Sequence, residues 1–258
     1  MSFAYREKVL VGGAMLSLAL VSTTMHAQET DEFSRKNTWT VFSEYANTSS
    51  HILLGQARQR KLADFGGSYA WRIGHTGLRY VVEYRPALFE SDVTLTDQST
   101  YVQNPQPVGE SPYTVTSTQV VEGACRPLTY INTVTIVAGT TTVGTETVTS
   151  VITCGRHWTY GEAITPVGLR YSFMTKRPMQ PFVIATAGYM FSDHAVPLDS
   201  AGFFNFTFDF GAGIEVFRSK TQSFSVEARY HHFGNNNTAS SNPGVDSLVY
   251  KLSYNFGR

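Results

Sequence analysis

The sequence predicts an all-β protein, specifically an eight-stranded antiparallel up-and-down transmembrane β-barrel. Three observations lead to this prediction. Many segments alternate apolar and polar residues with a period of two. Short and long connections between these segments alternate along the chain, and the charged residues of the segments fall on the polar face.

Residues 1–27 have the features of a secretory signal peptide. Arg6 and Lys8 precede an apolar run over 9–21, and the small residue Ala27 follows. The run is shorter than the roughly 20 residues that a helix needs to span a bilayer. We therefore expect cleavage near Ala27 and export of residues 28–258 as a single barrel domain.

Composition narrows the possible functions. Charged residues make up 16% of the chain and aromatic residues 13%, and no run of Lys and Arg suggests a nucleic-acid partner. No CxxC motif or Cys/His cluster is present, so neither a metal nor a cofactor is expected. Four histidines near predicted loops also lack ligand spacing: His51, His75, His157 and His194.

The clearest strand pattern covers 203–217. Phe204, Phe206, Phe208 and Phe210 share one parity, and residues such as Asn205, Asp209 and Glu215 share the other. A strict period of two over this length indicates a strand with one apolar and one polar face.

Seven further segments complete the set of eight. Clear alternation marks 78–88, 167–173, 224–231 and 248–256, and weaker strands cover about 37–46, 61–73 and 179–192. Many of these segments reach ten residues, a length typical of tilted membrane strands and longer than most soluble ones. Trp39, Trp71 and Trp158 lie near strand ends, where aromatic residues mark the membrane interface.

The connections fall into two length classes. Short turns are expected at 74–77, 175–178 and 218–221, and longer loops at about 47–60, 90–157, 193–202 and 234–245. Outer-membrane barrels have short periplasmic turns and long outer loops. The long loops are therefore expected to be extracellular.

The polar faces carry charges of both signs. If the apolar faces meet lipid, the charges must lie in the lumen, where opposite charges can pair. A soluble lipocalin-like barrel is the alternative, and it requires the reverse orientation. The residues expected inside are Arg79, Glu83, Arg85, Arg170, Asp209, Glu215, Glu227, Arg229 and Lys251.

The long Thr-rich insertion at 90–157 contains both cysteines, Cys125 and Cys154. In an exported protein, such a pair favours a disulfide. Two structures for the insertion remain open at this stage: β-hairpins above the membrane, or a partly disordered segment.

Two polar residues interrupt the apolar faces of the last hairpin. His232 continues the parity of Phe224 and Tyr230, and Asp246 continues that of Leu248. A symmetric register places them side by side on the lipid-facing surface. Either the two side chains have a function on this surface, or they lie at the level of the lipid headgroups and have none. Their spacing in the sequence does not favour one interpretation over the other.

Four stretches near the end of the chain resemble the lipid A deacylase family (PagL-type), also described as bacterial acyloxyacyl hydrolases. They are YHHFGN at 230–235, NPGVDS at 242–247, FNFTFDFGAG at 204–213 and CGRHWTYG at 154–161. The resemblance implies an eight-stranded outer-membrane barrel with lipid A, the anchor of lipopolysaccharide, and membrane lipid as partners. It implies hydrolysis of an ester-linked acyl chain and predicts no oligomeric state.

The family motif is His-x-Ser-Asn with a later carboxylate. By resemblance, His232 is the general base, Asp246 orients it, and Asn235 is associated with the oxyanion. Gly234 stands where the nucleophilic serine is expected, and glycine has no oxygen that could attack an ester.

This departure leaves three hypotheses. The protein binds lipid A with its serine-esterase activity weak or lost; or a water beside Gly234 replaces the serine; or Ser240, Ser241 or Ser247 does so. The first is favoured, since losing one member of a triad leaves only residual catalysis. A barrel that is purely structural is the remaining alternative.

Overall fold

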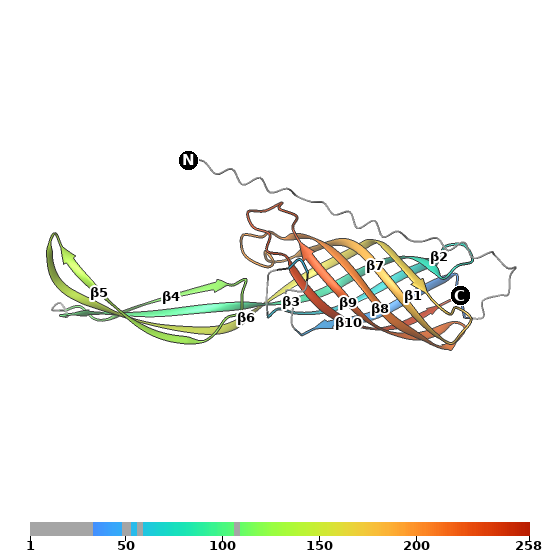
Figure 1. Cartoon of the computed structure of the whole chain (residues 1–258), viewed down its shortest axis with the longest axis horizontal. Helices are drawn as coiled ribbons and strands as arrows, with labels where there is room; N and C mark the ends of the chain where they lie inside the picture. The colour runs from blue at the N-terminus through green and yellow to red at the C-terminus, as the bar shows by residue number, and fades with distance from the viewer. Residues whose placement is uncertain (1–32, 48–52, 56–58, 106–108) are drawn as a thin grey trace. The chain divides into compact units, whose positions relative to one another are not determined.

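The computed structural model describes residues 33–47, 53–55, 59–105 and 109–258 (Figure 1). The predicted signal peptide at 1–27 lies outside these residues. No helix of the described part of the chain is long and apolar enough to cross a membrane. The strands are β1 (Asn37–Ala46), β2 (Lys61–Arg72), β3 (Leu78–Asn104), β4 (Tyr113–Val120), β5 (Leu128–Ala138), β6 (Thr141–Ser172), β7 (Met179–Ser192), β8 (Phe204–Ser219), β9 (Gln222–Gly234) and β10 (Val245–Gly257).

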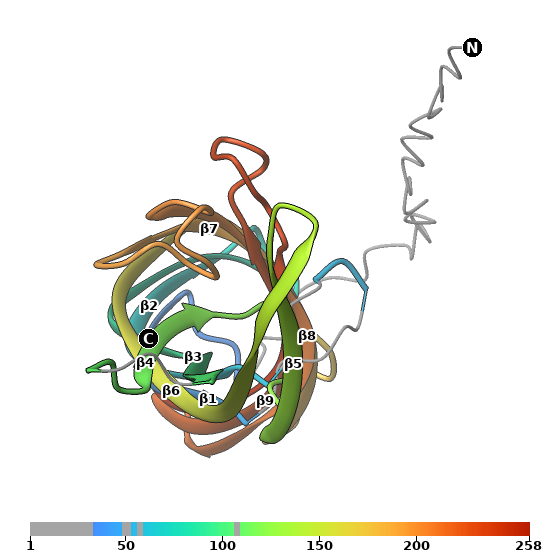
Figure 2. The same ribbon diagram turned by 90° about the vertical axis from the view of Figure 1, so that its left-hand side faces the viewer.

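Eight of the strands form a closed antiparallel ring, as predicted. The order of hydrogen-bonded neighbours is β3-β2-β1-β10-β9-β8-β7-β6, and pairing of β3 with β6 completes the ring. Figure 2 looks along the barrel and shows this closure. Because a closed ring leaves no strand edge unpaired, every barrel strand has a neighbour on both sides.

The alternation of the sequence becomes an outer and an inner face. Phe206, Phe208 and Phe210 are 39%, 45% and 58% exposed on the outside of β8, whereas Arg85 and Glu215 are 1% and 0% exposed inside. A barrel with this orientation hides its charges and exposes apolar side chains, as membrane barrels do. The transmembrane orientation is confirmed, and the lipocalin-like alternative is excluded.

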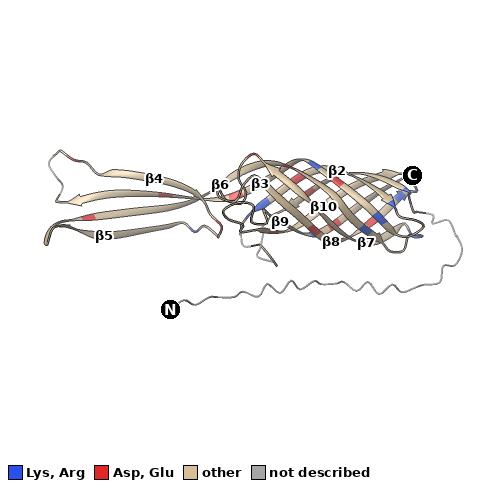
Figure 3. Ribbon diagram, turned by 90° about the horizontal axis from the view of Figure 1, so that it is seen from above, with Lys and Arg blue, Asp and Glu red and all other residues tan. Residues whose placement is uncertain are grey.

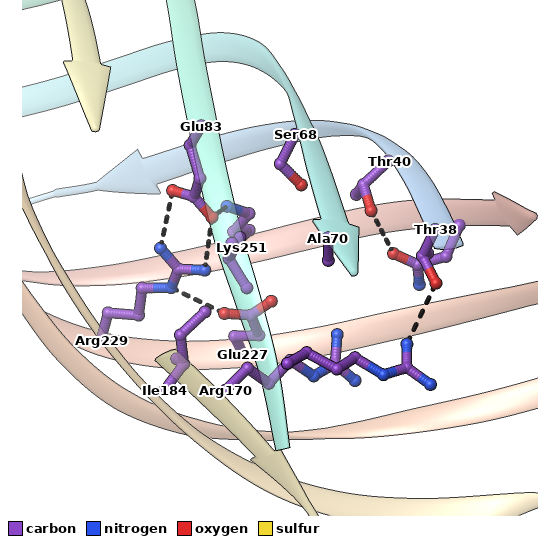
Figure 4. Close-up of a pocket in the computed structure, with 13 residues that line it drawn as sticks. Thr38, Thr40, Ser68, Ala70, Glu83, Arg170, Ile184, Glu227, Arg229 and Lys251 are labelled. Carbon is purple, nitrogen blue, oxygen red and sulfur yellow. Dashed lines mark hydrogen bonds and ion pairs between the residues drawn. The ribbon is translucent and has the colours of Figure 1, made fainter. Parts of the chain in front are cut away.

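The lumen contains a connected network of ion pairs. All nine charged residues expected inside are buried, and charged residues are concentrated on the barrel strands in Figure 3. Glu83 accepts hydrogen bonds from Arg229 at 3.0 Å and from Lys251 at 2.8 Å, as Figure 4 shows. Arg85 lies 2.9 Å from the same carboxylate. The opposite charges thus compensate one another's desolvation.

Two further arginines of the lumen come from outside the strands. Arg35 pairs with Glu215 and donates to the hydroxyl of Ser223 at 2.6 Å. Arg60 pairs with Glu90 at 3.3 Å and donates to the carbonyl of Pro197 at 2.7 Å. Arg35 thus attaches the segment before β1, and Arg60 the segment before β2, to the inner face of the barrel.

The insertion forms strands rather than an irregular loop. β3 and β6 remain paired as far as Asn104 and Thr145, and β4 and β5 pair with their outer parts. We call residues 94–155 the extension. A disulfide joins Cys125, between β4 and β5, to Cys154 on β6. The predicted disulfide and the hairpin alternative are thereby confirmed.

Aromatic side chains lie near both ends of the barrel wall. Trp39, Tyr69, Trp71 and Tyr80 form a row of ring contacts near the short turns, with centroids 4.5 to 5.9 Å apart. Trp158 is 55% exposed toward the other end of β6. The tryptophans predicted at strand ends therefore lie where the wall would meet the membrane interfaces.

Candidate functional site

The last hairpin brings His232 and Asp246 together. β9 and β10 pair in the symmetric register, so that His232 lies opposite Asp246. Nδ1 of His232 donates to Oδ1 of Asp246 at 2.8 Å. The hydroxyl of Tyr230 donates to the same oxygen at 2.7 Å, and its ring lies nearly parallel to the imidazole. A carboxylate in this position fixes both the tautomer and the orientation of the imidazole ring.

The second oxygen of Asp246 is held by a distant part of the chain. The main-chain N–H groups of Leu53 and Leu54 donate to Oδ2 at 2.7 and 2.9 Å. Asp246 is completely buried, although its parity faces outward, while the side chain of His232 remains 21% exposed. The connection between β1 and β2 thus covers the carboxylate and leaves the imidazole accessible. No sequence signal pointed to this contact.

Gly234 occupies the end of β9 beside the imidazole. A Cβ atom built on Gly234 would lie 3.7 Å from Nε2 of His232 and 2.8 Å from Oδ1 of Asn242. A serine hydroxyl extends one atom further than Cβ, so it could reach the imidazole. A hydroxyl on residue 234 would therefore lie beside the imidazole, and glycine provides none.

The side chain of Asn235 is buried in the loop between β9 and β10. Its Nδ2 donates to the carbonyls of Ala201 and Ser241, the latter at 2.7 Å, and its Oδ1 accepts from Asn237 N–H at 2.9 Å. Its main-chain N–H donates to Oδ1 of Asn242 at 2.9 Å. Both hydrogens of the Asn235 amide are thus engaged in holding the loop, and its main-chain N–H faces Asn242.

A groove with two phenylalanines and several polar residues adjoins the imidazole on the outer wall. Phe206 and Phe208 of β8 pair with Gly234 and His232 of β9, and all four line the groove together with Thr207, Asn236 and Asn242. Because the aromatic pair comes from the lipid-facing side of β8, one side of the groove beside the imidazole is apolar.

The three alternative serines have other surroundings. The hydroxyl of Ser240 donates to the Ser200 carbonyl at 3.0 Å, and the hydroxyls of Ser241 and Ser200 are 2.7 Å apart. Ser247 is buried and pairs with His231 on the opposite parity from His232. These contacts give the serines structural roles in the loop and the lumen.

His231 forms a second histidine–carboxylate pair, which sequence reasoning did not identify. Its Nδ1 lies 2.5 Å from Oδ1 of Asp209 inside the barrel. The alternation places it on the lumenal face, directly beside His232 in the sequence and on the other side of the wall. Among the described residues, no cluster of three or more His, Cys, Asp or Glu could hold a metal ion.

The comparisons with solved structures return outer-membrane proteins. Neisserial surface protein A has 13% identity and a TM-score of 0.43, covering 86% of this chain and 97% of its own. The outer membrane enzyme PagL has 16% sequence identity and a TM-score of 0.41, and the match covers 85% of this chain and 99% of PagL. The outer membrane protein OprG from Pseudomonas aeruginosa has 10% sequence identity and a TM-score of 0.41, and the match covers 89% of this chain and 100% of OprG. No curated protein sequence matches.

The family comparison agrees with the resemblance read from the sequence. The family model described as Lipid A 3-O-deacylase (PagL) matches residues 135–255. The matched segment runs from β5 to β10 and contains His232, Gly234, Asn235 and Asp246. Over residues 135–255 the chain is therefore similar to the lipid A 3-O-deacylase (PagL) family.

Proposed function

We propose that this protein is an outer-membrane barrel that binds lipid A beside the outer ends of β9 and β10, with its serine-esterase activity weak or lost at Gly234. One observation carries the proposal: the hydrogen-bonded His232–Asp246 pair opens onto a groove of the lipid-facing wall that Phe206 and Phe208 line, and Gly234 offers no hydroxyl beside the imidazole.

The orientation in the membrane follows from the two ends of the barrel. Short turns connect β2 to β3, β6 to β7 and β8 to β9, while the extension and the longer loops lie at the other end. Outer-membrane barrels direct their long loops to the exterior. The extension and the groove then face the outside, where lipid A forms the outer leaflet, and residues 1–27 serve as the export signal.

The chemistry of the site supports binding more than cleavage. Asp246 orients His232 so that a nucleophile at position 234 would lose its proton to Nε2. Gly234 supplies no oxygen, and hydrolases that lose a triad member retain only the residual rate that binding and the oxyanion site provide. The Phe206–Phe208 groove does not depend on the missing hydroxyl, so lipid binding persists without it.

Hydrolysis by a water at Gly234 is the competing function. The accessible imidazole favours it, since Nε2 lies 3.7 Å from the Cβ position of residue 234. The side chain of Asn242 opposes it, since its oxygen lies 2.8 Å from that position and takes up the room beside Gly234. We therefore rank binding without cleavage first.

Mass spectrometry of lipid A from cells with and without the gene tests the loss of activity. The expected result is the same acylation pattern in both. Loss of one acyl chain in the cells that carry the gene would overturn that part of the proposal and favour the water mechanism. His232→Ala would then restore the original pattern.

Native mass spectrometry of the purified barrel tests the binding. We expect lipid A to be retained over a phospholipid of the same charge, and Phe206→Asp to reduce retention several-fold because it places a carboxylate in the groove. Phe224→Asp is the matched control, since Phe224 is exposed on the same wall outside the groove. Equal retention by both variants would remove the groove as the binding site.

A further inference from the structure

The end of the barrel that carries the short turns is strongly basic. Among the described residues of this end, no Asp or Glu is exposed, since Glu215 is buried in the lumen. The carboxylates of residues 29, 31 and 32 lie outside the described residues, and counting all three would still leave an excess of cations. The Lys and Arg residues of this end, which we call the basic collar, are Lys36, Arg72, Lys176, Arg177, Arg218, Lys220 and Arg258 (blue in Figure 3).

The opposite end of the barrel carries exposed charges of both signs. Glu162 and Asp193 are exposed there, and so is Arg156. The formal net charge of the whole chain is zero, so the basic collar is a local feature rather than part of a general excess of cations. The asymmetry favours an anionic partner at the short-turn end alone.

The basic collar lies beside the row of aromatic rings on the outer wall. Arg72 directly follows Trp71, and Arg258 lines a groove together with Trp39 and Tyr69. Aromatic residues of this kind mark the boundary between hydrocarbon and lipid headgroups. The cations of the collar therefore lie at the height where a leaflet has its phosphate groups.

The cations are also distributed around the whole rim. Lys36 precedes β1 and Arg258 follows β10, and each of the three short turns has at least one cation in it or at its edge. These positions cover every connection at this end of the closed ring. A protein partner would contact a patch of such a rim, whereas lipid headgroups surround all of it. The distribution therefore favours lipid over protein as the partner.

We propose that the basic collar binds the headgroup phosphates of anionic phospholipids, such as phosphatidylglycerol, in the leaflet at the short-turn end. Ammonium and guanidinium groups form charge-assisted hydrogen bonds with phosphate oxygens. The inference goes beyond the binding of lipid A, which concerns the other end of the barrel, and shares with it only the orientation in the membrane. The two ends of the wall then select different lipids.

Tryptophan quenching by brominated lipids tests the inference on the full chain in vesicles. The chain has three tryptophans, so Trp158→Phe leaves Trp39 and Trp71 as reporters of the short-turn end. The vesicles contain equal amounts of phosphatidylglycerol and phosphatidylcholine, with bromine on the acyl chains of one lipid or the other. We expect the relative association constant to favour phosphatidylglycerol about fivefold, the effect of roughly one cation for each bound lipid. About 0.5 M NaCl should reduce this preference, because salt screens exposed charges.

Two charge variants of equal size show whether the collar causes the preference. Lys36→Gln/Arg177→Gln/Arg218→Gln removes three collar cations and should lower the preference to less than about twofold. The matched control removes three cations outside the collar and should keep the full preference; it is Lys61→Gln/Arg126→Gln/Arg156→Gln. Heat-modifiable gel mobility shows that each variant is folded.

A reporter at the other end shows whether the preference is local. Trp39→Phe/Trp71→Phe leaves Trp158 alone, and its quenching should show no preference for phosphatidylglycerol. A preference of equal size at Trp158 would overturn the inference, as would equal quenching of Trp39 and Trp71 by the two lipids. A preference that persists in the collar variant would overturn it as well.

The outcomes separate this inference from the proposed function. A barrel that retains lipid A and shows no preference at Trp39 and Trp71 overturns the role of the collar and leaves the binding of lipid A intact. A barrel that shows the preference and loses it in the collar variant, but does not retain lipid A, supports the collar and overturns the proposed function.

Discussion

The barrel and the extension are built from the same two long strands but are stabilised in different ways. In the barrel, β3 and β6 bury paired charges on one side and expose apolar residues on the other. In the extension, β4 and β5 are almost fully exposed on both faces, and within the described residues each pairs with only one neighbour. The barrel depends on its lumen and on lipid, and the extension depends on backbone pairing and one disulfide.

The comparison shows that a side chain exposed on the surface of this protein can face one of two environments, lipid or water. Ile214 on β8 is 46% exposed and Ile131 on β5 is 66% exposed. The first is accessible to hydrocarbon and the second to water, if the barrel is embedded as proposed. Substituting a charged residue is therefore expected to destabilise the protein at Ile214 and to have little effect at Ile131, although both side chains are exposed.

The largest effect is expected from Glu83→Gln in the lumen. Glu83 binds Arg229 and Lys251 and lies against Arg85, so its loss removes one of the carboxylates that compensate these three buried cations. Glu44 and Glu227 remain as their partners, and the buried network is left with excess positive charge. We expect the free energy of unfolding to fall by about 3–5 kcal/mol. Urea unfolding of the barrel in detergent micelles, followed by tryptophan fluorescence, measures this.

The exposed carboxylate of Asp199, in the loop between β7 and β8, provides the control for Glu83. Asp199→Asn should change the unfolding free energy by less than about 0.5 kcal/mol. If both variants unfold at the same urea concentration, the lumenal network does not stabilise the barrel.

Removal of the disulfide should affect the extension alone. Cys125 and Cys154 are separated by 29 positions, and a crosslink over such a loop contributes about 3–4 kcal/mol in the chain-entropy model. We expect Cys125→Ser/Cys154→Ser to be cut by endoproteinase Glu-C at the exposed Glu122, between β4 and β5, much faster than wild type. Limited proteolysis measures this, and an unchanged heat-modifiable mobility of the barrel is the internal control. Unchanged cleavage would contradict the local role.

A charged residue introduced on the lipid-facing wall should lower the free energy of unfolding less than the loss of a lumenal carboxylate does. Ile214→Arg near the middle of β8 is expected to destabilise the barrel by about 2–4 kcal/mol in lipid vesicles. Ile131→Arg on the exposed face of β5 is expected to change stability by less than about 0.5 kcal/mol. Equal effects in a urea titration of both variants would show that the wall of β8 is not in contact with hydrocarbon.

The smallest effect is expected from removing the extension. Replacing residues 96–153 by a short Asn-Gly turn, together with Cys154→Ser, joins β3 to β6 where Leu95 and Cys154 are paired. The eight barrel strands keep all their neighbours, so the unfolding free energy should change by about 1 kcal/mol or less. A barrel that fails to fold would show that the extension supports it.

The sequence predicted the barrel because alternation is a local property. The period-two pattern of residues 203–217 and of the last hairpin gave the strands, and the hairpin symmetry gave the pairing of His232 with Asp246. The outer parts of β3 and β6 were not assigned as strands, because Thr and Val occupy both faces of the extension and leave no apolar and polar side to distinguish.

The parts of the site that escaped prediction are contacts between distant segments. The N–H groups of Leu53 and Leu54 reach Asp246 from a loop without any regular pattern, and main-chain donors leave no mark in a sequence. The contact between Asn235 and Asn242 depends on the path of the loop between β9 and β10, where Asn236 and Asn237 adopt positive φ. Arg35 and Arg60 enter the lumen from outside the strands, where alternation carries no information.

The pairing of β1 with β10 joins the first and last strands of the ring. Tyr45 meets Tyr250 across this seam, which joins residues about two hundred positions apart, and the 13 residues of β10 fill the last gap. Until β10 is in place, β1 and β9 both present open edges that can recruit foreign strands. Shortening the chain within β10 is therefore expected to give an open sheet that is prone to aggregation rather than a smaller barrel.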